Sequence, residues 1–117
     1  MRIAPRTHQV LDFVLVAVFA AAPTVFGFGG LAAIVAYGLA VVHLGLTLAT
    51  RFSSTARRPV PIGLHAFVEL MVGVMLLIVP WLLGWTAAAQ RFFLTTAVVI
   101  LVIWLFSRYS EEKRKAG

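Results

Sequence analysis

The chain has 117 residues, 62% of them hydrophobic and only 12% charged, with a mean hydropathy of +0.99 and a formal net charge of +6. This composition lies outside the range of a soluble domain of the same length. The lack of cysteine excludes disulfides, thiolate metal sites and cysteine nucleophiles.

The first half is dominated by a run without acidic or basic residues, from Phe13 to Thr50. That run is about twice the ~20 residues that one spanning helix needs, so it predicts a helical hairpin with helices at Thr7–Phe26 and Leu31–Thr50. Glycines between them permit a tight reversal. Small residues, among them Gly38 and Gly45 on one face, suggest close helix packing in this hairpin.

The second half continues with a basic linker and two more apolar segments, which predict helices at Ile62–Leu83 and Ala88–Ser107. None of the four segments shows the alternation of apolar and polar residues expected of a membrane barrel, so helices are favoured over strands. We expect a first transmembrane hairpin at residues 1–52, a cytoplasmic linker at 53–61, a second hairpin at 62–109 and a charged tail at 110–117.

The second half repeats the first at an offset of 57 residues, without a gap. The residues in register are His8 with His65, Asp12 with Glu69, Pro23 with Pro80, Gly27 with Gly84, Phe28 with Trp85, and Arg51-Phe52-Ser53 with Arg108-Tyr109-Ser110. The repeat predicts an all-α membrane protein of two tandem hairpins, related by a pseudo-two-fold axis along the membrane normal.

Basic residues give the predicted orientation, because cytoplasmic ends of spans collect Lys and Arg. Of the ten Lys and Arg residues, only Arg91 lies at the end of the predicted spans that faces away from the termini and the central linker. We therefore expect both termini to be cytoplasmic, in an inner or plasma membrane, with the basic residues in contact with anionic lipids rather than nucleic acid. The residues expected to contact headgroups are Arg51, Arg57, Arg58 and Arg108; those expected to form an aromatic belt at the opposite interface are Phe26, Phe28, Trp81 and Trp85.

Each half carries a histidine followed four residues later by a carboxylate, His8 with Asp12 and His65 with Glu69. This spacing places both side chains on one helix face. His43 in the second predicted helix lies at a similar depth, so five ionisable groups can converge in the cytoplasmic half of the bundle. The favoured interpretation is a structural cluster in which these groups bond to one another across the hairpins.

Three functional alternatives remain open for this cluster. The histidines and carboxylates can together hold a divalent metal. His43 can serve as an axial ligand of a haem or chlorophyll-type pigment. Asp12, Glu69 and His43 can form part of a proton or ion path, because ionisable groups inside a membrane are costly and often functional.

The segments around the two prolines resemble a known family. Val79-Pro80-Trp81-Leu82-Leu83-Gly84-Trp85 and Ala22-Pro23-Thr24-Val25-Phe26-Gly27-Phe28 are similar to the core of SPW-repeat membrane proteins, whose units carry Ser-Pro-Trp followed by a glycine and an aromatic. Here Val79 or Ala22 replaces the serine, and Thr24 replaces the tryptophan of the first copy. The resemblance implies paired membrane helices and carries over no catalytic residues.

The sequence also contains no nucleophile motif, phosphate-binding glycine loop or zinc-protease helix. We therefore expect a non-enzymatic membrane protein, acting as an accessory or scaffolding subunit beside a larger membrane complex or as a homo-oligomer. The cluster leaves open whether any cofactor is bound.

Overall fold

The computed structural model describes residues 3–51 and 59–107, and most of these lie in four long helices. The helices are α1 (Pro5–Phe26), α2 (Gly30–Ala49), α3 (Ile62–Leu82) and α4 (Ala87–Phe106). Each is long and apolar enough to cross a membrane, since 20 residues at 1.5 Å each span about the ~30 Å of a hydrocarbon core. The prediction of four apolar helices is confirmed, and each helix begins and ends within two residues of its expected bounds.

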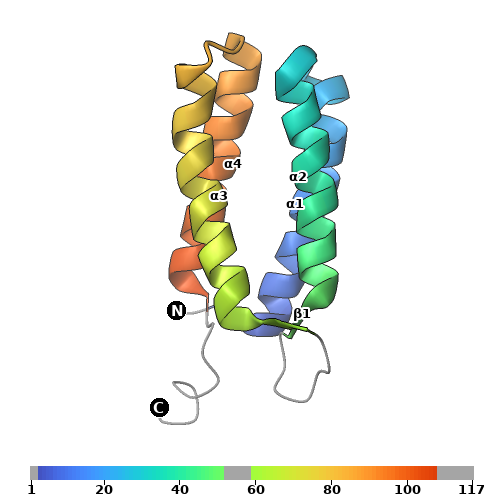
Figure 1. Cartoon of the computed structure of the whole chain (residues 1–117), viewed down its shortest axis with the longest axis vertical. Coiled ribbons are helices and arrows are strands. Elements are labelled where there is room, and N and C mark those ends of the chain that lie inside the picture. Colours follow the sequence, from blue (N-terminus) through green and yellow to red (C-terminus); the bar gives the residue numbers. More distant parts are fainter. Residues whose placement is uncertain (1–2, 52–58, 108–117) are drawn as a thin grey trace.

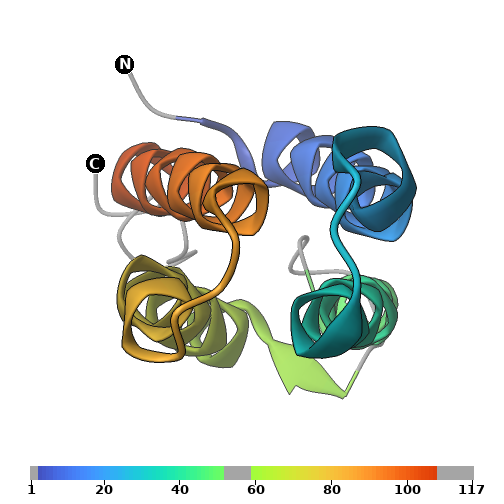
Figure 2. The same cartoon turned by 90° about the horizontal axis from the view of Figure 1, so that it is seen from above.

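The helices are arranged as two pairs (Figure 1). α1 packs along α2, and α3 packs along α4. Seen from above, the four helices stand at the corners of a square, where α1 also neighbours α4 and α2 also neighbours α3 (Figure 2). We call the end that carries the α1–α2 and α3–α4 connections the turn end, and the end that carries the short strands the terminal end.

Both connections at the turn end begin with the same backbone arrangement. Gly27 has a φ of 70° and Gly84 a φ of 63°, in the left-handed region that glycine occupies without steric cost. One residue further on, the Phe28 amide donates to the Pro23 carbonyl at 3.1 Å, and the Trp85 amide donates to the Pro80 carbonyl at 3.0 Å. The carbonyl groups of Pro23 and Pro80 therefore accept the hydrogen bonds that end α1 and α3.

At the terminal end, α2 and α4 stop one residue earlier than expected, and the chain becomes extended. Thr50 starts β1 (Thr50–Arg51), which pairs in parallel with β2 (Val60–Pro61), so that Thr50 lies opposite Val60. Ser107 forms a parallel bridge with Ile3, whose amide donates to the Phe106 carbonyl. The segment before α1 is thus tied to the end of α4, and the segment before α3 to the end of α2.

The hydrophobic core lies along the inner faces of the helices, with Phe19, Phe93 and Ile100 almost fully buried. A Cβ on Gly73 would approach Leu101 to 2.7 Å, so this glycine allows the close approach of α3 and α4. A Cβ on Gly38 or Gly45 would meet open space, which contradicts their expected role in packing.

Large apolar side chains cover the outside of the bundle. Leu82, Val41 and Val25 are each about 70% exposed or more, at 76%, 71% and 69%. They come from three different helices, so the apolar surface extends around the bundle. A surface of this kind suits hydrocarbon and not water as its surroundings, which agrees with an integral membrane protein.

Candidate functional site

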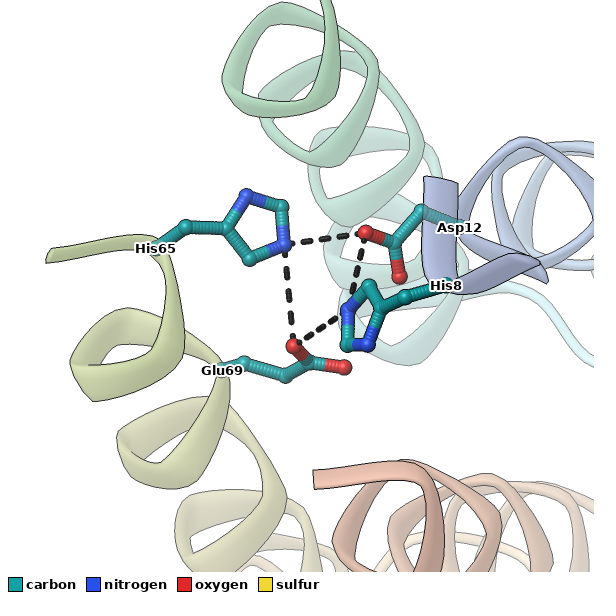
Figure 3. A group of neighbouring side chains, drawn as sticks. All are labelled: His8, Asp12, His65 and Glu69. Carbon is teal, nitrogen blue, oxygen red and sulfur yellow. Dashed lines mark ion pairs between the residues drawn. The ribbon is translucent and has the colours of Figure 1, made fainter. Parts of the chain in front are cut away.

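The structure brings five ionisable side chains together near the terminal end of the bundle, and Figure 3 shows four of them, His8, Asp12, His65 and Glu69. His8 and Asp12 come from α1, His65 and Glu69 from α3, and His43 from α2. All five are buried, with His43 the most exposed at 7%. The group includes every histidine of the chain and both carboxylates of the described residues. We refer to these five residues as the polar cluster.

Four of these residues form a closed ring of contacts in which nitrogen and oxygen alternate. His8 Nε2 lies 3.1 Å from Asp12 Oδ2 and 3.0 Å from Glu69 Oε2. His65 Nε2 lies 2.9 Å from the same oxygen of Asp12 and 3.6 Å from that of Glu69. Each histidine therefore touches a carboxylate of its own helix and one from the other helix pair, as the dashed lines in Figure 3 show. These contacts join α1 to α3 across the bundle.

His43 is attached to this ring through Asp12. Its Nε2 lies 3.3 Å from Asp12 Oδ1, the oxygen that does not face His8 or His65. Asp12 therefore contacts three histidines, from α1, α2 and α3, whereas Glu69 contacts two. The sequence predicted that these five groups would share a depth; the structure adds that Asp12 is their centre.

The Nδ1 atoms of His8 and His65, which take no part in the ring of contacts, bond to hydroxyl groups at the ends of the opposite helix pair. His65 Nδ1 lies 2.8 Å from Thr50 Oγ1, and His8 Nδ1 lies 2.6 Å from Ser107 Oγ. Thr50 donates its own proton to the Leu46 carbonyl, so its oxygen must accept from His65, and His65 carries a proton on Nδ1. The proton on Nδ1 determines which states are open to Nε2, the nitrogen that faces the carboxylates.

With Nδ1 protonated, His65 Nε2 can either carry a second proton or present a lone pair toward two carboxylates. A lone pair facing carboxylate oxygens at 2.9 Å and 3.6 Å is repulsive. Two ionised carboxylates buried without compensation would also be very costly in this environment. These nitrogens and oxygens can therefore lie so close only with protons between them or with a cation bound among them.

A cation would find one ligand atom on each of His8, Asp12, His65 and Glu69, because these four atoms all lie within 4.8 Å of one another. Imidazole nitrogen and carboxylate oxygen are ligands for zinc and neighbouring first-row metals. We refer to these four residues as the four-ligand site. His43 lies outside this site and contacts it through Asp12.

Thr50 and Ser107 were missed as site residues from the sequence. Both were expected to be the last residues of helices, and nothing local indicates that their hydroxyls reach the other pair of helices. A signal was available in the repeat itself, because Thr50 and Ser107 are also 57 positions apart and both carry a hydroxyl. Polar residues at matched places in both copies are candidates for the same contact.

The residues predicted at the turn end occupy two environments. Phe26 and Trp81 are about half exposed. Phe28 is buried and packs on Phe92 and Phe93, and Trp85 packs on Phe93 with ring centroids 5.1 Å apart. Of the residues predicted to contact headgroups, Arg51 has its backbone in β1, and the others, Arg57, Arg58 and Arg108, lie outside the described residues.

Comparison of the chain with protein-family models, with curated proteins and with solved structures finds no match. The resemblance to SPW-repeat proteins therefore stays a prediction. The fold and the site together define a class: an all-helical protein with four helices apolar enough for a membrane, built around a buried cluster of histidines and carboxylates.

Proposed function

We propose that this protein binds a divalent transition-metal ion between its two pairs of helices, in the four-ligand site of His8, Asp12, His65 and Glu69. The observation that carries the proposal is the closed ring of two imidazole nitrogens and two carboxylate oxygens, buried together and pointing at one another. The proposal takes up one of the alternatives left open by the sequence.

The spacing of the ring supports a metal of this class. Its four N–O contacts measure 3.1, 3.0, 2.9 and 3.6 Å, close to the ~3.3 Å that separates ligands about 2.0 Å from a tetrahedral zinc. One ligand atom from each of the four residues can be chosen so that all lie within 4.8 Å of one another. Calcium and magnesium prefer shells made entirely of oxygen, so the two imidazoles disfavour them. The four residues of the site offer no sulfur, which disfavours copper(I).

The hydrogen bonds around the site also favour a metal. Metal-binding histidines usually donate their other N–H to a second group, which fixes the tautomer and the ring orientation. Thr50 accepts from His65 Nδ1 in this way, and Ser107 lies at the same place beside His8. A doubly charged ion would balance the two carboxylates, so the filled site would be neutral inside a low-dielectric bundle.

The same contacts support the expected pseudo-two-fold relation between two tandem hairpins. The contacts of His8 with two carboxylates and a hydroxyl have counterparts 57 positions away in those of His65, including the bond to a hydroxyl at the end of the other pair of helices. A metal at the centre of such an arrangement would lie on the axis and hold the hairpins together. The pigment alternative is less well supported, because the Nε2 of His43 faces Asp12.

The metal proposal is tested by measuring the metal content of protein purified in mild detergent. We expect a single zinc, manganese or iron ion per chain by elemental mass spectrometry, and a fall in thermal stability when EDTA removes it. Glu69→Gln keeps the size of the side chain but removes a charged ligand, and should lose the ion. Thr96→Val is the matched control, since Thr96 is buried and bonds only to carbonyls of its own helix.

Protein that binds none of these metals, before or after reloading, would refute the proposal. So would metal that is retained equally by Glu69→Gln and by the control. The cluster would then be a network of hydrogen-bonded histidines and carboxylates without a metal.

We further propose that the protein acts beside a larger membrane complex, as an accessory subunit without catalytic activity. The exposed apolar side chains of every helix and the short connections support a role through contacts within the membrane. Co-purification of a defined membrane protein in mild detergent is the expected result, and a chain that always elutes alone would contradict it. Ion conduction stays a prediction, testable by flux into liposomes.

A further inference from the structure

A groove of about 730 Å³ lies between α1 and α4, in a part of the molecule that the polar cluster does not use. Figure 2 shows these two helices side by side, each in a different pair. The groove runs from Phe26 and Ala88 near the turn end to Leu11 and Ile103 toward the terminal end. Its volume is in the range of about 300–1,000 Å³ typical of sites for small molecules.

The walls of the groove provide apolar contacts. Val14, Val18 and Val99 are representative of its lining. The two threonines that reach it are already bonded within α4: Thr95 donates to the Arg91 carbonyl at 2.8 Å, and Thr96 donates to the carbonyls of Phe92 and Phe93. An occupant of the middle of the groove should therefore be hydrocarbon.

Arg91 is the one charged residue in the lining, and it stands at the turn end of the groove. The two carboxylates of the described residues, Asp12 and Glu69, both lie in the polar cluster at the other end of the bundle. The exposed guanidinium of Arg91 thus has no acidic partner among residues 3–51 and 59–107. A guanidinium binds phosphate well, because its donors match two phosphate oxygens.

We infer that the groove binds one acyl chain of an anionic phospholipid whose phosphate is held by Arg91. From Arg91 to Ile103 the groove extends along 12 residues of α4, or about 18 Å. This is slightly longer than one leaflet of hydrocarbon, about 15 Å. A single extended chain fits this length, with its headgroup at the level of the turn end. The inference does not depend on the metal proposal.

The test uses purified, delipidated protein in a mild non-ionic detergent, to which phosphatidylglycerol or phosphatidylcholine with the same acyl chains is added. Native mass spectrometry measures the lipid retained by each protein molecule. We expect phosphatidylglycerol to be retained in preference, and Arg91→Gln to weaken its binding about fivefold, as for the loss of one basic contact. Arg6→Gln removes an exposed arginine at the other end of α1, outside the groove, and is the charge control. It should lower the retention of phosphatidylglycerol less than Arg91→Gln does.

A second variant tests the acyl-chain part of the site. Val99→Phe fills the groove from an exposed position of α4, and should reduce the binding of both lipids. Val41→Phe adds the same bulk on α2, outside the groove, and should change neither. Binding unaffected by Arg91→Gln and Val99→Phe would overturn the inference. So would a cross-link from a cysteine at Val18 to a second protein chain in native membranes, since the groove would then hold a helix.

Discussion

Thr50 and His65 belong to different pairs of helices, and the hydrogen bond between them, 2.8 Å from oxygen to nitrogen, is completely buried. Thr50 follows α2 and His65 lies in the first turn of α3. The threonine hydroxyl also donates to Leu46, so it accepts from the histidine. The bond therefore orients the ring of His65 and directs its other nitrogen toward Asp12 and Glu69. Ser107 holds the same position beside His8.

Replacing either hydroxyl should disturb the four-ligand site without touching a ligand. Thr50→Val removes the acceptor of His65 and leaves a buried N–H without its partner, at a cost of about 1–3 kcal/mol in stability. We expect metal affinity to fall about 10- to 100-fold, as for other losses of an outer hydrogen bond. Competition with a chromogenic chelator measures the affinity, and Thr96→Val is the control. Unchanged affinity would show that the bond does not orient His65.

Ser107→Ala should have the same effect on the side of His8. If the two hairpins contribute equally to the site, its loss of affinity should match that of Thr50→Val to within about threefold, a difference below about 0.7 kcal/mol. Parallel chelator titrations of the two variants provide the comparison. A loss confined to one variant would mean that a single histidine accounts for binding.

Asp12 should be the more sensitive of the two carboxylates. Asp12→Asn alters the contacts of three histidines, whereas Glu69→Gln alters those of two. Breaking buried ion pairs by removing one partner typically costs about 3–5 kcal/mol, and we expect Asp12→Asn at the upper end of that range. Thermal unfolding in detergent ranks the two variants. Equal or reversed losses would argue against Asp12 as the centre of the polar cluster.

Gly73→Ala should destabilise the contact between α3 and α4. The added Cβ would come within 2.7 Å of Leu101, so either the leucine or the helix must move, and overpacking of this kind costs about 1–3 kcal/mol. Gly38→Ala is the control, because its Cβ meets open space and alanine favours a helix by about 1 kcal/mol. Thermal unfolding is again the measurement; because both substitutions gain the same helix propensity, Gly73→Ala should be less stable than Gly38→Ala by about 1–3 kcal/mol.

The predicted orientation can be tested directly, because the chain contains no cysteine. Single cysteines at Gly29, in the turn between α1 and α2, and at Thr7, near the start of α1, should report opposite sides of the membrane. We expect a membrane-impermeant maleimide added to intact cells to label the first and not the second. Labelling of Thr7→Cys alone would reverse the topology.

The helices could be predicted from the sequence because their lengths are set by the thickness of hydrocarbon and their boundaries by charge, glycine and proline. The convergence of His8, Asp12, His43, His65 and Glu69 could be predicted from spacing and depth. The hydroxyl partners could not, because Thr50 and Ser107 act only after two distant helix ends are brought together. Gly73 was missed for a related reason: its role depends on where Leu101 lies on the neighbouring helix.

The distribution of the site between the two halves of the chain has a consequence for its assembly. Each half supplies one imidazole, one carboxylate and one alcohol, and each alcohol bonds to the imidazole of the other half. Neither half can complete the arrangement alone. A polypeptide holding one half of this chain could therefore assemble the same set of groups only by pairing with a second copy of itself.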